Sequence, residues 1–565
     1  MLLFLFGCVM LVVGYFLYGN IVEAILQPDD RKTPAVKKFD GVDFMILPTW
    51  KNMLIQLLNI AGIGPVIGVI LGIKFGSIVF LIIPVGNIIG GAVHDFISGM
   101  MSMRNQGANL PIIIKRNLGQ FSFWILSGFM ILLLLLVVAV FVNVPADLLN
   151  GMIPDILNKM FPSLNNGMVS SPTIFWIAVG AIGLYYIVAT LFPIDQIIGR
   201  FYPIFGLILL LGTAAVFVAL LWHGNNDPAH FMIETEAFKA NMLKDPIIPC
   251  LFVTIACGIM SGFHGTQSPI IARTLKSERD AKKVFYGMMV VEGLIGMVWA
   301  AAGMAIYNLN TAMMSETPMK VLLNITQYFL GGPMGNITIL AVVILAITSG
   351  DTAMRCIRLT IAENLHISQS SVINRLAICI PLILIIVALL LWSNKSAESF
   401  KILWNYFAWG NQVLAALTLL TGTVWLLRKR RNPLIAVIPG AFMCFVVITY
   451  ILWTSKAHGG PAGIGLNLKI SYMIAAGLTL LLFGWAFYLG SASTESEEED
   501  PSNRIENKNG DWDDLQDLED SDGECSLNPE NRKKWKRFAK LAVLADLKNM
   551  EEMDDEELLK RIIGK

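Results

Sequence analysis

The chain has 565 residues, of which 55% are hydrophobic and only 15% are charged, whereas about 25% of residues are charged in a typical soluble domain. Its 42 basic and 42 acidic residues balance, so the net charge indicates no nucleic-acid partner. This composition excludes an ordinary soluble globular protein. The sequence therefore predicts an all-α protein that crosses the lipid bilayer many times.

The apolar segments set the number of spans. A helix needs about 20 apolar residues to cross the hydrocarbon core, because lipid offers its backbone no hydrogen-bond partners. About thirteen segments meet this requirement. They lie near residues 1–22, 51–73, 77–102, 121–143, 173–193, 202–222, 247–272, 283–307, 336–361, 373–392, 402–427, 433–453 and 470–490. The first lacks a basic leader and a small-residue cleavage site, so we interpret it as a span and not as a signal peptide.

The positions of Lys and Arg predict the orientation of these spans. If the N-terminus lies outside, about 21 of these residues fall in cytoplasmic loops and about 9 in outer loops. Because cytoplasmic loops carry the excess of positive charge, we expect an outside N-terminus and a cytoplasmic C-terminus.

Two predicted spans carry residues that interrupt a helix. The span 51–73 contains Ala61-Gly62-Ile63-Gly64-Pro65, where Gly adds backbone freedom and Pro removes a donor. The span 247–272 is rich in Gly and polar residues near its middle, namely Ser261, Gly262, His264, Gly265 and Thr266. We expect both helices to break there, and we predict that the freed backbone groups and these residues bind a substrate.

The two breaks lie five spans apart, which indicates an inverted repeat. Residues 51–222 would form the first five-helix repeat and residues 247–427 the inverted second one, with an extra helix at 1–22 and two further helices at 433–490. An odd number of spans in each half forces opposite orientations. The alternative is ordinary close packing, since Gly64, Gly68 and Gly72 form a face of small residues.

Few ionisable residues lie at membrane depth, and each is costly there, so each is a functional candidate. His94, Asp95, Glu292 and Asp351 are the residues that we predict to couple transport to a proton or another cation. For Asp95 the alternative is a structural hydrogen bond. For Asp351 it is an ion pair with Arg355 one helical turn away, or a cation site shared with Thr348 and Ser349.

The last part of the chain, residues 491–565, is predicted to be cytoplasmic. It begins with an acidic linker, for which disorder is expected. From Asn531 a basic, amphipathic helical pattern follows. This helix would rest on the inner leaflet, bind a partner, or remain a solvated appendage.

The sequence contains no evidence of catalysis. The seven cysteines form no C-x-x-C pair, so neither a disulfide framework nor a metal site is indicated, and we expect no cofactor. H-E-x-x-H, G-x-S-x-G and P-loop motifs do not occur, and Ser349-Gly350-Asp351 is only a fragment of a membrane aspartyl protease motif. We therefore predict a protein that is not an enzyme. A nutrient sensor that signals through its C-terminal tail is the alternative to a transporter.

Several ordered blocks resemble the carbon starvation protein A family. They lie at residues 33–35, 40–43, 48–49, 61–68 and 90–96, with later blocks at 261–264 and 348–358. The resemblance runs from residue 1 to about residue 490. It implies the LeuT-like fold of the amino acid/polyamine/cation superfamily, and a transporter in the cytoplasmic membrane that imports peptides or pyruvate with protons during nutrient limitation.

One departure from the family limits what the resemblance implies. Many members carry a His-His pair just before the first break, whereas this chain has Gln56-Leu57-Leu58-Asn59-Ile60. A coupling role of that pair cannot be transferred. The matching blocks also do not separate peptide transporters from pyruvate transporters.

Overall fold

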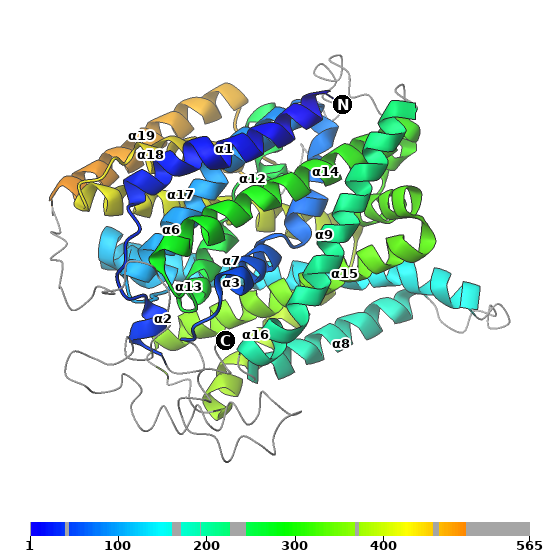
Figure 1. Cartoon of the computed structure of the whole chain (residues 1–565), viewed down its shortest axis with the longest axis horizontal. Coiled ribbons are helices and arrows are strands. Elements are labelled where there is room, and N and C mark those ends of the chain that lie inside the picture. The colour runs from blue at the N-terminus through cyan, green and yellow to red at the C-terminus, as the bar shows by residue number, and fades with distance from the viewer. Residues whose placement is uncertain are drawn as a thin grey trace.

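A computed structural model shows the chain as a bundle of helices packed side by side (Figure 1). It describes residues 2–39, 44–160, 171–191, 194–226, 245–365, 367, 372–455 and 463–492. Within these ranges, extended pairing is limited to two isolated bridges, which join Lys32 to Ser277 and Leu47 to Leu275. The predicted acidic linker and amphipathic helix fall almost entirely outside the described residues, which end in the last transmembrane helix.

The helices have the following bounds. In chain order they are α1 (Leu2–Leu26), α2 (Pro34–Lys37), α3 (Thr49–Ile60), η1 (Gly64–Gly68), α4 (Val69–Gly72), η2 (Ile73–Phe75), α5 (Val79–Gly86), η3 (Asn87–Gly91), α6 (Ala92–Arg104), α7 (Leu110–Met160), α8 (Ser171–Leu191), α9 (Ile194–Asn226), η6 (Ile247–Leu251), α11 (Phe252–Thr254), α12 (Ala256–Ile259), α13 (Gly262–Ala272), η7 (Glu278–Asp280), η8 (Lys282–Gly287), α14 (Met288–Leu309), η9 (Thr311–Ser315), α15 (Pro318–Asn364), α16 (Val372–Ser393), α17 (Ala397–Arg428), α18 (Leu434–Trp453) and α19 (Leu468–Ala492).

These helices confirm the prediction of a multi-pass membrane protein. In the described residues, 10 helices are long and apolar enough to cross a membrane, or up to 11 if the bent pair Thr49–Ile60 and Gly64–Phe75 is one span. A shorter apolar helix covers Thr173–Ala189. The remaining predicted span, 247–272, is divided into the short helices η6, α11, α12 and α13.

The first break is narrower than the sequence predicted. The helices on its two sides are bent by 51°, and the backbone leaves helical geometry at Ala61, which has φ −77° and ψ 41°. Gly64 and Pro65, which we expected in the break, instead begin the next helix, η1. The physical reason is that a helix leaves its first N–H groups without partners, so Pro fits well at a helix start.

The second break is also shorter than expected. Helix α12 ends at Ile259 and α13 begins at Gly262, with Ser261 extended at φ −125° and ψ 124°. His264, Gly265 and Thr266 lie inside α13, which corrects the expectation that they lie on unwound backbone. The side chains of His264 and Thr266 are therefore held on a helix.

The glycines of the first broken span pack against the second. A Cβ added at Gly64 would lie 2.2 Å from Cβ of Cys257, and one added at Gly72 would lie 2.0 Å from Ile255. A Cβ at Gly68 would approach the Thr254 carbonyl oxygen to 3.1 Å. The small-residue face therefore brings the two broken spans into close contact, as the close-packing alternative expects. The two helix breaks are present as well.

Two pairs of helical irregularities recur along the chain. Helix α7 is interrupted at Gly119, with φ 87° and ψ 176°, and α15 at Gly331, with φ 74° and ψ 174°. The left-handed φ of both residues favours glycine. The π-helical segment η3 precedes α6, and the π-helical segment η8 precedes α14. In each half of the chain these features follow the broken span in the same order.

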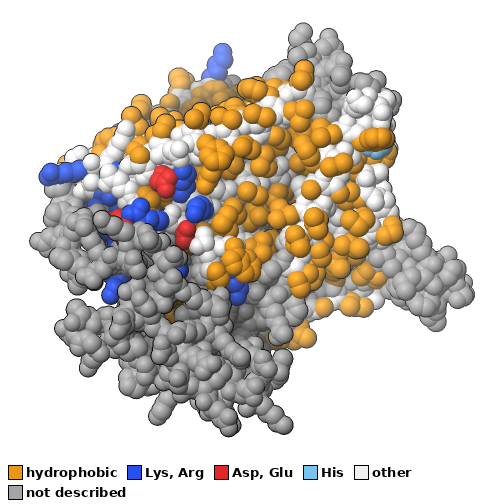
Figure 2. All heavy atoms as spheres, in the orientation of Figure 1, with side chains coloured by type: hydrophobic (Ala, Val, Ile, Leu, Met, Phe, Trp, Pro, Cys, Tyr) orange, Lys and Arg blue, Asp and Glu red, His pale blue; other side chains and the backbone are white. Residues whose placement is uncertain are grey.

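Loops that we predicted to share one side of the membrane do contact one another. Arg104 pairs with Glu278 at 3.0 Å, Lys282 pairs with Glu23 at 2.7 Å, and Arg428 donates to the Arg116 carbonyl oxygen at 2.8 Å. Figure 2 shows Lys and Arg side chains gathered toward one end of the visible face, while apolar side chains cover much of the rest. Which end faces the cytoplasm stays a prediction.

Candidate functional site

Asp95 joins two helices that are far apart in the sequence. Its Oδ1 lies 2.9 Å from Nδ1 of His94, on the same helix α6. Its Oδ2 lies 3.1 Å from Nδ1 of His264, on α13 directly after the second break. All three side chains are buried. The structure thus brings together three of the predicted site residues, two of them assigned to coupling and one to substrate binding.

Glu292 lies next to this group without a hydrogen-bond partner. The residue is 0% exposed, and neither of its carboxylate oxygens has a partner. Its Oε2 lies 3.9 Å from Nε2 of His264, which is beyond hydrogen-bond range. A buried carboxyl group without partners is costly, so such groups occur mostly where function requires them. We call His94, Asp95, His264 and Glu292 the acid–imidazole cluster.

Hydroxyl groups hold α6 and α13 in register around the cluster. The hydroxyl oxygens of Ser98 on α6 and Ser268 on α13 are 2.7 Å apart. Ser268 also donates to the His264 carbonyl oxygen at 2.8 Å. Gly265 lies against His94, since a Cβ there would touch the His94 ring at 3.4 Å. These contacts position both imidazoles against Asp95.

Asn411 of α17 caps the second break, and the sequence analysis missed it. Its Oδ1 accepts from the backbone N–H of Phe263 at 2.8 Å, and its amide lies 3.0 Å from the Ser261 hydroxyl. Gly262 packs on the same helix, because a Cβ there would lie 2.3 Å from the Asn411 carbonyl oxygen. The N–H of Phe263 and the Ser261 hydroxyl are therefore occupied within the protein. A polar residue inside the apolar span 402–427 was the signal that could have identified Asn411.

Polar residues of α15 satisfy the first break. The Ser349 hydroxyl donates to the Asn59 carbonyl oxygen at 3.3 Å, and Thr352 donates to the Asn59 side chain at 3.1 Å. A Cβ at Gly62 would lie 3.1 Å from the same Ser349 hydroxyl. Thr348 donates to a carbonyl oxygen of its own helix. These hydroxyls thus donate to the backbone and to the first break. The cation site that Thr348 and Ser349 would share with Asp351 stays a prediction.

Asp351 lies apart from the acid–imidazole cluster in its contacts. Its Oδ2 is 3.4 Å from Nε of Arg355, so the predicted pairing one turn along the helix is present. Arg355 in turn donates to the Ala189 carbonyl oxygen of α8 at 2.5 Å. The contacts of this pair join α15 to α8, whereas the cluster joins α6, α13 and α14.

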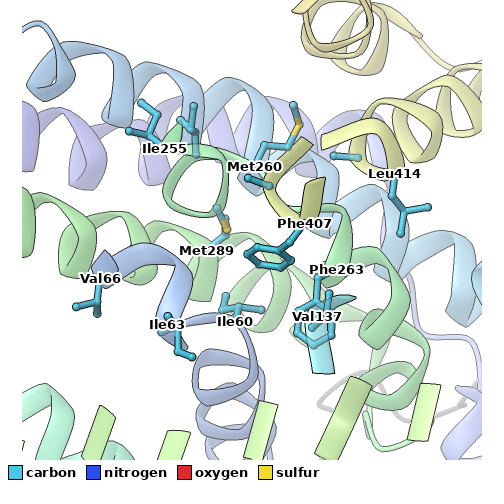
Figure 3. Close-up of a cluster of buried hydrophobic side chains, with 14 of the residues drawn as sticks. Ile60, Ile63, Val66, Val137, Ile255, Met260, Phe263, Met289, Phe407 and Leu414 are labelled. Carbon is cyan, nitrogen blue, oxygen red and sulfur yellow. The ribbon is translucent and has the colours of Figure 1, made fainter. Parts of the chain in front are cut away.

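Apolar side chains surround the two breaks. Figure 3 shows Ile60 and Ile63 of the first break in one cluster with Met260 and Phe263 of the second. The cluster also contains residues from three other helices, namely Val137 of α7, Met289 of α14, and Phe407 and Leu414 of α17. Apolar walls with a few convergent polar groups are typical of small-molecule sites. Among the described residues, no group of three or more His, Cys, Asp or Glu side chains could hold a metal ion.

The family model of carbon starvation protein CstA matches residues 1–190, 181–331 and 330–450. The chain belongs to the carbon starvation protein CstA family. The resemblance found in the sequence blocks is thereby confirmed.

Relatives in this family include proteins with named functions. An uncharacterized membrane protein of Haemophilus influenzae is 38% identical over 58% of this chain and 98% of its own length. The peptide transporter CstA of Bacillus subtilis is 26% identical over 54% of this chain and 58% of its own length. The pyruvate/proton symporter BtsT of Escherichia coli is 26% identical over 51% of this chain and 46% of its own length.

The alignments with the two named transporters span only about half of each transporter. Both are membrane transporters, which does not favour the sensor alternative. A solved manganese transporter of Eremococcus coleocola is also similar, at 13% identity and a TM-score of 0.49, over 81% of this chain and 99% of that one.

Proposed function

We propose that this chain is a secondary active transporter, and not an enzyme, that imports a peptide or pyruvate across the cytoplasmic membrane together with protons. The observation that carries the proposal is the acid–imidazole cluster, in which Asp95 binds His264 beside the second break while Glu292 lies unpartnered 3.9 Å from that imidazole. Membership of the family supports it. Both alternatives for the substrate are named functions of relatives.

The transport cycle that we infer is alternating access between two five-helix repeats, residues 51–222 and 247–427. The matched interruptions at Gly119 and Gly331 support this division, as do the matched π-helical segments η3 and η8. The two broken spans pack against each other through Gly64 and Cys257. Rocking of one repeat against the other would change this contact and the access to the substrate residues Gly62, Gly64, Pro65, Ser261, Gly262, His264, Gly265 and Thr266.

Proton coupling would use the ring nitrogens that Asp95 leaves free. Because Asp95 engages Nδ1 of both imidazoles, the Nε2 atoms remain to exchange protons. Nε2 of His94 is buried without a partner, and Nε2 of His264 faces Glu292. The 3.9 Å between His264 and Glu292 must shorten before a proton can pass. A movement of α13 against α14 would provide this change, which links proton transfer to the conformational cycle.

Uptake by reconstituted vesicles tests the transport function. The purified full chain in proteoliposomes should accumulate labelled alanyl-alanine or pyruvate when a proton gradient is imposed, and should only equilibrate the substrate without one. Vesicles that carry His264→Asn should lose the dependence on the gradient. Absence of gradient-driven accumulation of either compound by the wild-type protein would overturn the proposal.

A narrower experiment tests the contact between the breaks. Gly64→Leu places a side chain where even a Cβ would lie 2.2 Å from Cys257, so we expect transport to be abolished while membrane insertion continues. Gly180→Leu on α8 is the matched control, because no atom lies within 4 Å of a Cβ there. Wild-type uptake by Gly64→Leu would remove the first break from the mechanism.

The orientation is part of the proposal. We infer an outside N-terminus and a cytoplasmic C-terminus from the excess of Lys and Arg in the loops that include Arg104, Arg116 and Arg428. The contacts among these loops support a common side. A fluorescent protein fused after residue 565 should fold and fluoresce in the cytoplasm. A fusion that fluoresces only after export would reverse the orientation.

A further inference from the structure

Two buried side-chain amides lie outside the acid–imidazole cluster and lack partners. Gln56 on α3 and Gln267 on α13 are each 0% exposed. The oxygen and the nitrogen of both amides have no hydrogen-bond partner. Removing an amide from water without replacing its hydrogen bonds is costly, and buried polar groups are nearly always bonded. Four such atoms on two neighbouring helices therefore call for an explanation.

The register of α3 and α13 places both amides along one interface. The two helices pack against each other, and Thr274 just after α13 donates to Asn52 near the start of α3 at 2.6 Å. Gln56 follows Asn52 by one turn on the same face of α3, and Gln267 precedes Thr274 by two turns on the same face of α13. From this contact, α3 leads forward along the chain to the first break, and α13 leads back to the second. Both amides therefore lie between the contact and the breaks.

Neighbouring amides on this interface differ because their side chains have hydrogen-bond partners. Asn52 donates to the carbonyl oxygens of Leu47 and Thr274 at 3.0 Å each. Asn59, one turn beyond Gln56, accepts from Thr352. Gln56 thus lies between two bonded amides on the same face of α3. The local structure can satisfy such groups, and it leaves Gln56 and Gln267 for another partner.

We propose that Gln56 and Gln267 form a specificity site for a substrate group that both donates and accepts hydrogen bonds, such as a peptide group. The inference rests on the proposed transport function and selects between its two substrates. A side-chain amide presents two N–H donors and one acceptor oxygen. The N–H and C=O of a peptide group satisfy both kinds of atom. Pyruvate offers acceptors only, so it would leave both glutamine oxygens buried and unpaired.

A matched pair of ligands tests this inference directly. Alanyl-alanine and its ester analogue alanyl-lactate differ only in that an ester oxygen replaces the peptide N–H. Binding of both, and of pyruvate, to the purified full chain is measured by calorimetry. We expect the amide to bind at least about tenfold more tightly than the ester, because the ester leaves a buried acceptor without a donor. Gln56→Met and Gln267→Met should each reduce this preference toward equality.

Stability separates a binding role from a structural one. Replacing an unpartnered amide by Met removes no hydrogen bond, so Gln56→Met and Gln267→Met should melt at or above the wild-type temperature. Asn52→Leu is the control, because it removes bonded atoms on the same helix face. It should melt at a lower temperature and keep the wild-type ratio of amide to ester affinity. Lower melting temperatures for both glutamine variants would show a structural role and overturn the inference.

The outcomes also distinguish this inference from the proposed function. Equal affinity for amide and ester in the wild-type protein, or binding of pyruvate without binding of the dipeptide, overturns the specificity site. Gradient-driven pyruvate uptake in the second case would leave the transport function standing. A preference for the amide that disappears in both glutamine variants supports the site, even if vesicles show no accumulation and the transport function fails.

Discussion

Two buried glutamates on one continuous stretch of the chain have opposite surroundings. Glu278 begins η7 and is 1% exposed, and Glu292 lies in α14 and is 0% exposed. The carboxylate of Glu278 accepts from Nε of Arg104 at 3.2 Å, from Nη2 of Arg104 at 3.0 Å and from the backbone N–H of Asp29 at 3.1 Å. The carboxylate of Glu292 accepts no hydrogen bond.

The difference separates a structural carboxylate from a functional candidate. Glu278 joins a loop of the second half to Arg104 at the end of α6 in the first half, and its bonds offset the cost of burial. Glu292 has no such compensation, although it lies beside an imidazole. Burial alone therefore does not identify a functional carboxyl group. Glu292 is a candidate because it is buried and its carboxylate also lacks hydrogen-bond partners.

The largest expected effect is on stability, at the partnered glutamate. Glu278→Ala leaves the Arg104 guanidinium, 3% exposed, without its buried carboxylate. Breaking one member of a buried pair costs about 3–5 kcal/mol. The melting temperature in detergent should fall markedly. Adding Arg104→Met to Glu278→Ala should recover most of the loss. If Glu278→Ala alone is as stable as the wild type, Glu278 has no structural role that sets it apart from Glu292.

His264 tests the intermediate case, Asp95, which has two partners. His264→Phe removes the bond to Oδ2 of Asp95 and leaves only the bond from His94. An unsatisfied buried acceptor costs about 1–3 kcal/mol, so the loss of stability should be smaller than for Glu278→Ala. Thermal melting of both variants in one detergent checks this order. Equal losses would mean that the second bond of Asp95 is as important as the whole Glu278 network.

Glu292→Gln should affect transport and not stability. The amide has the shape of the carboxyl group and no exchangeable charge, and no hydrogen bond of Glu292 is lost. We expect gradient-driven uptake to fall by roughly tenfold or more, while exchange of substrate without a gradient continues. Parallel uptake and exchange measurements in proteoliposomes check it. A variant with full gradient-driven uptake would exclude Glu292 from coupling.

The smallest effect is expected at Asp29, on the edge of the Glu278 network. Partial burial raises the pKa of Asp29, but hydrogen bonds from Arg31 outweigh it and hold the pKa below its ordinary value. A carboxylate with a lowered pKa stabilises the fold above its unfolded pKa of about 3.9, and this contribution is lost as the pH falls through the folded value. Asp29→Asn should therefore cost less than about 1 kcal/mol.

The pH profile of the same variant provides its check. The difference in melting temperature between wild type and Asp29→Asn should stay constant between pH 8 and pH 5, because both values lie above the unfolded pKa of about 3.9. The difference should shrink only below about pH 4. A difference that already shrinks near pH 6 would contradict the ionised state of Asp29 in this range.

Much of the fold could be predicted from the sequence, because lipid makes the signal local. Every spanning segment must satisfy its own backbone, so length and apolar composition identify it without knowledge of its neighbours. The Gly and Pro residues at 61–65 and the Gly-rich stretch near 261 likewise act on their own helices, and both breaks are present. Their limits were predicted too broadly, since Pro65 starts a helix and His264 lies within one.

The chemistry of the candidate site was decided by tertiary structure. His94, Asp95, His264 and Glu292 were identified one by one as polar residues at membrane depth, but nothing in their spacing indicated that Asp95 binds His264 across two helices. The cap from Asn411 and the unpartnered amides of Gln56 and Gln267 also depend on packing between distant segments. The sequence by itself determined which segments enter the membrane and where they break, because those are properties of each helix. Only the packed bundle decided which buried polar groups find partners, because a hydrogen bond requires two groups and the second lies elsewhere in the chain.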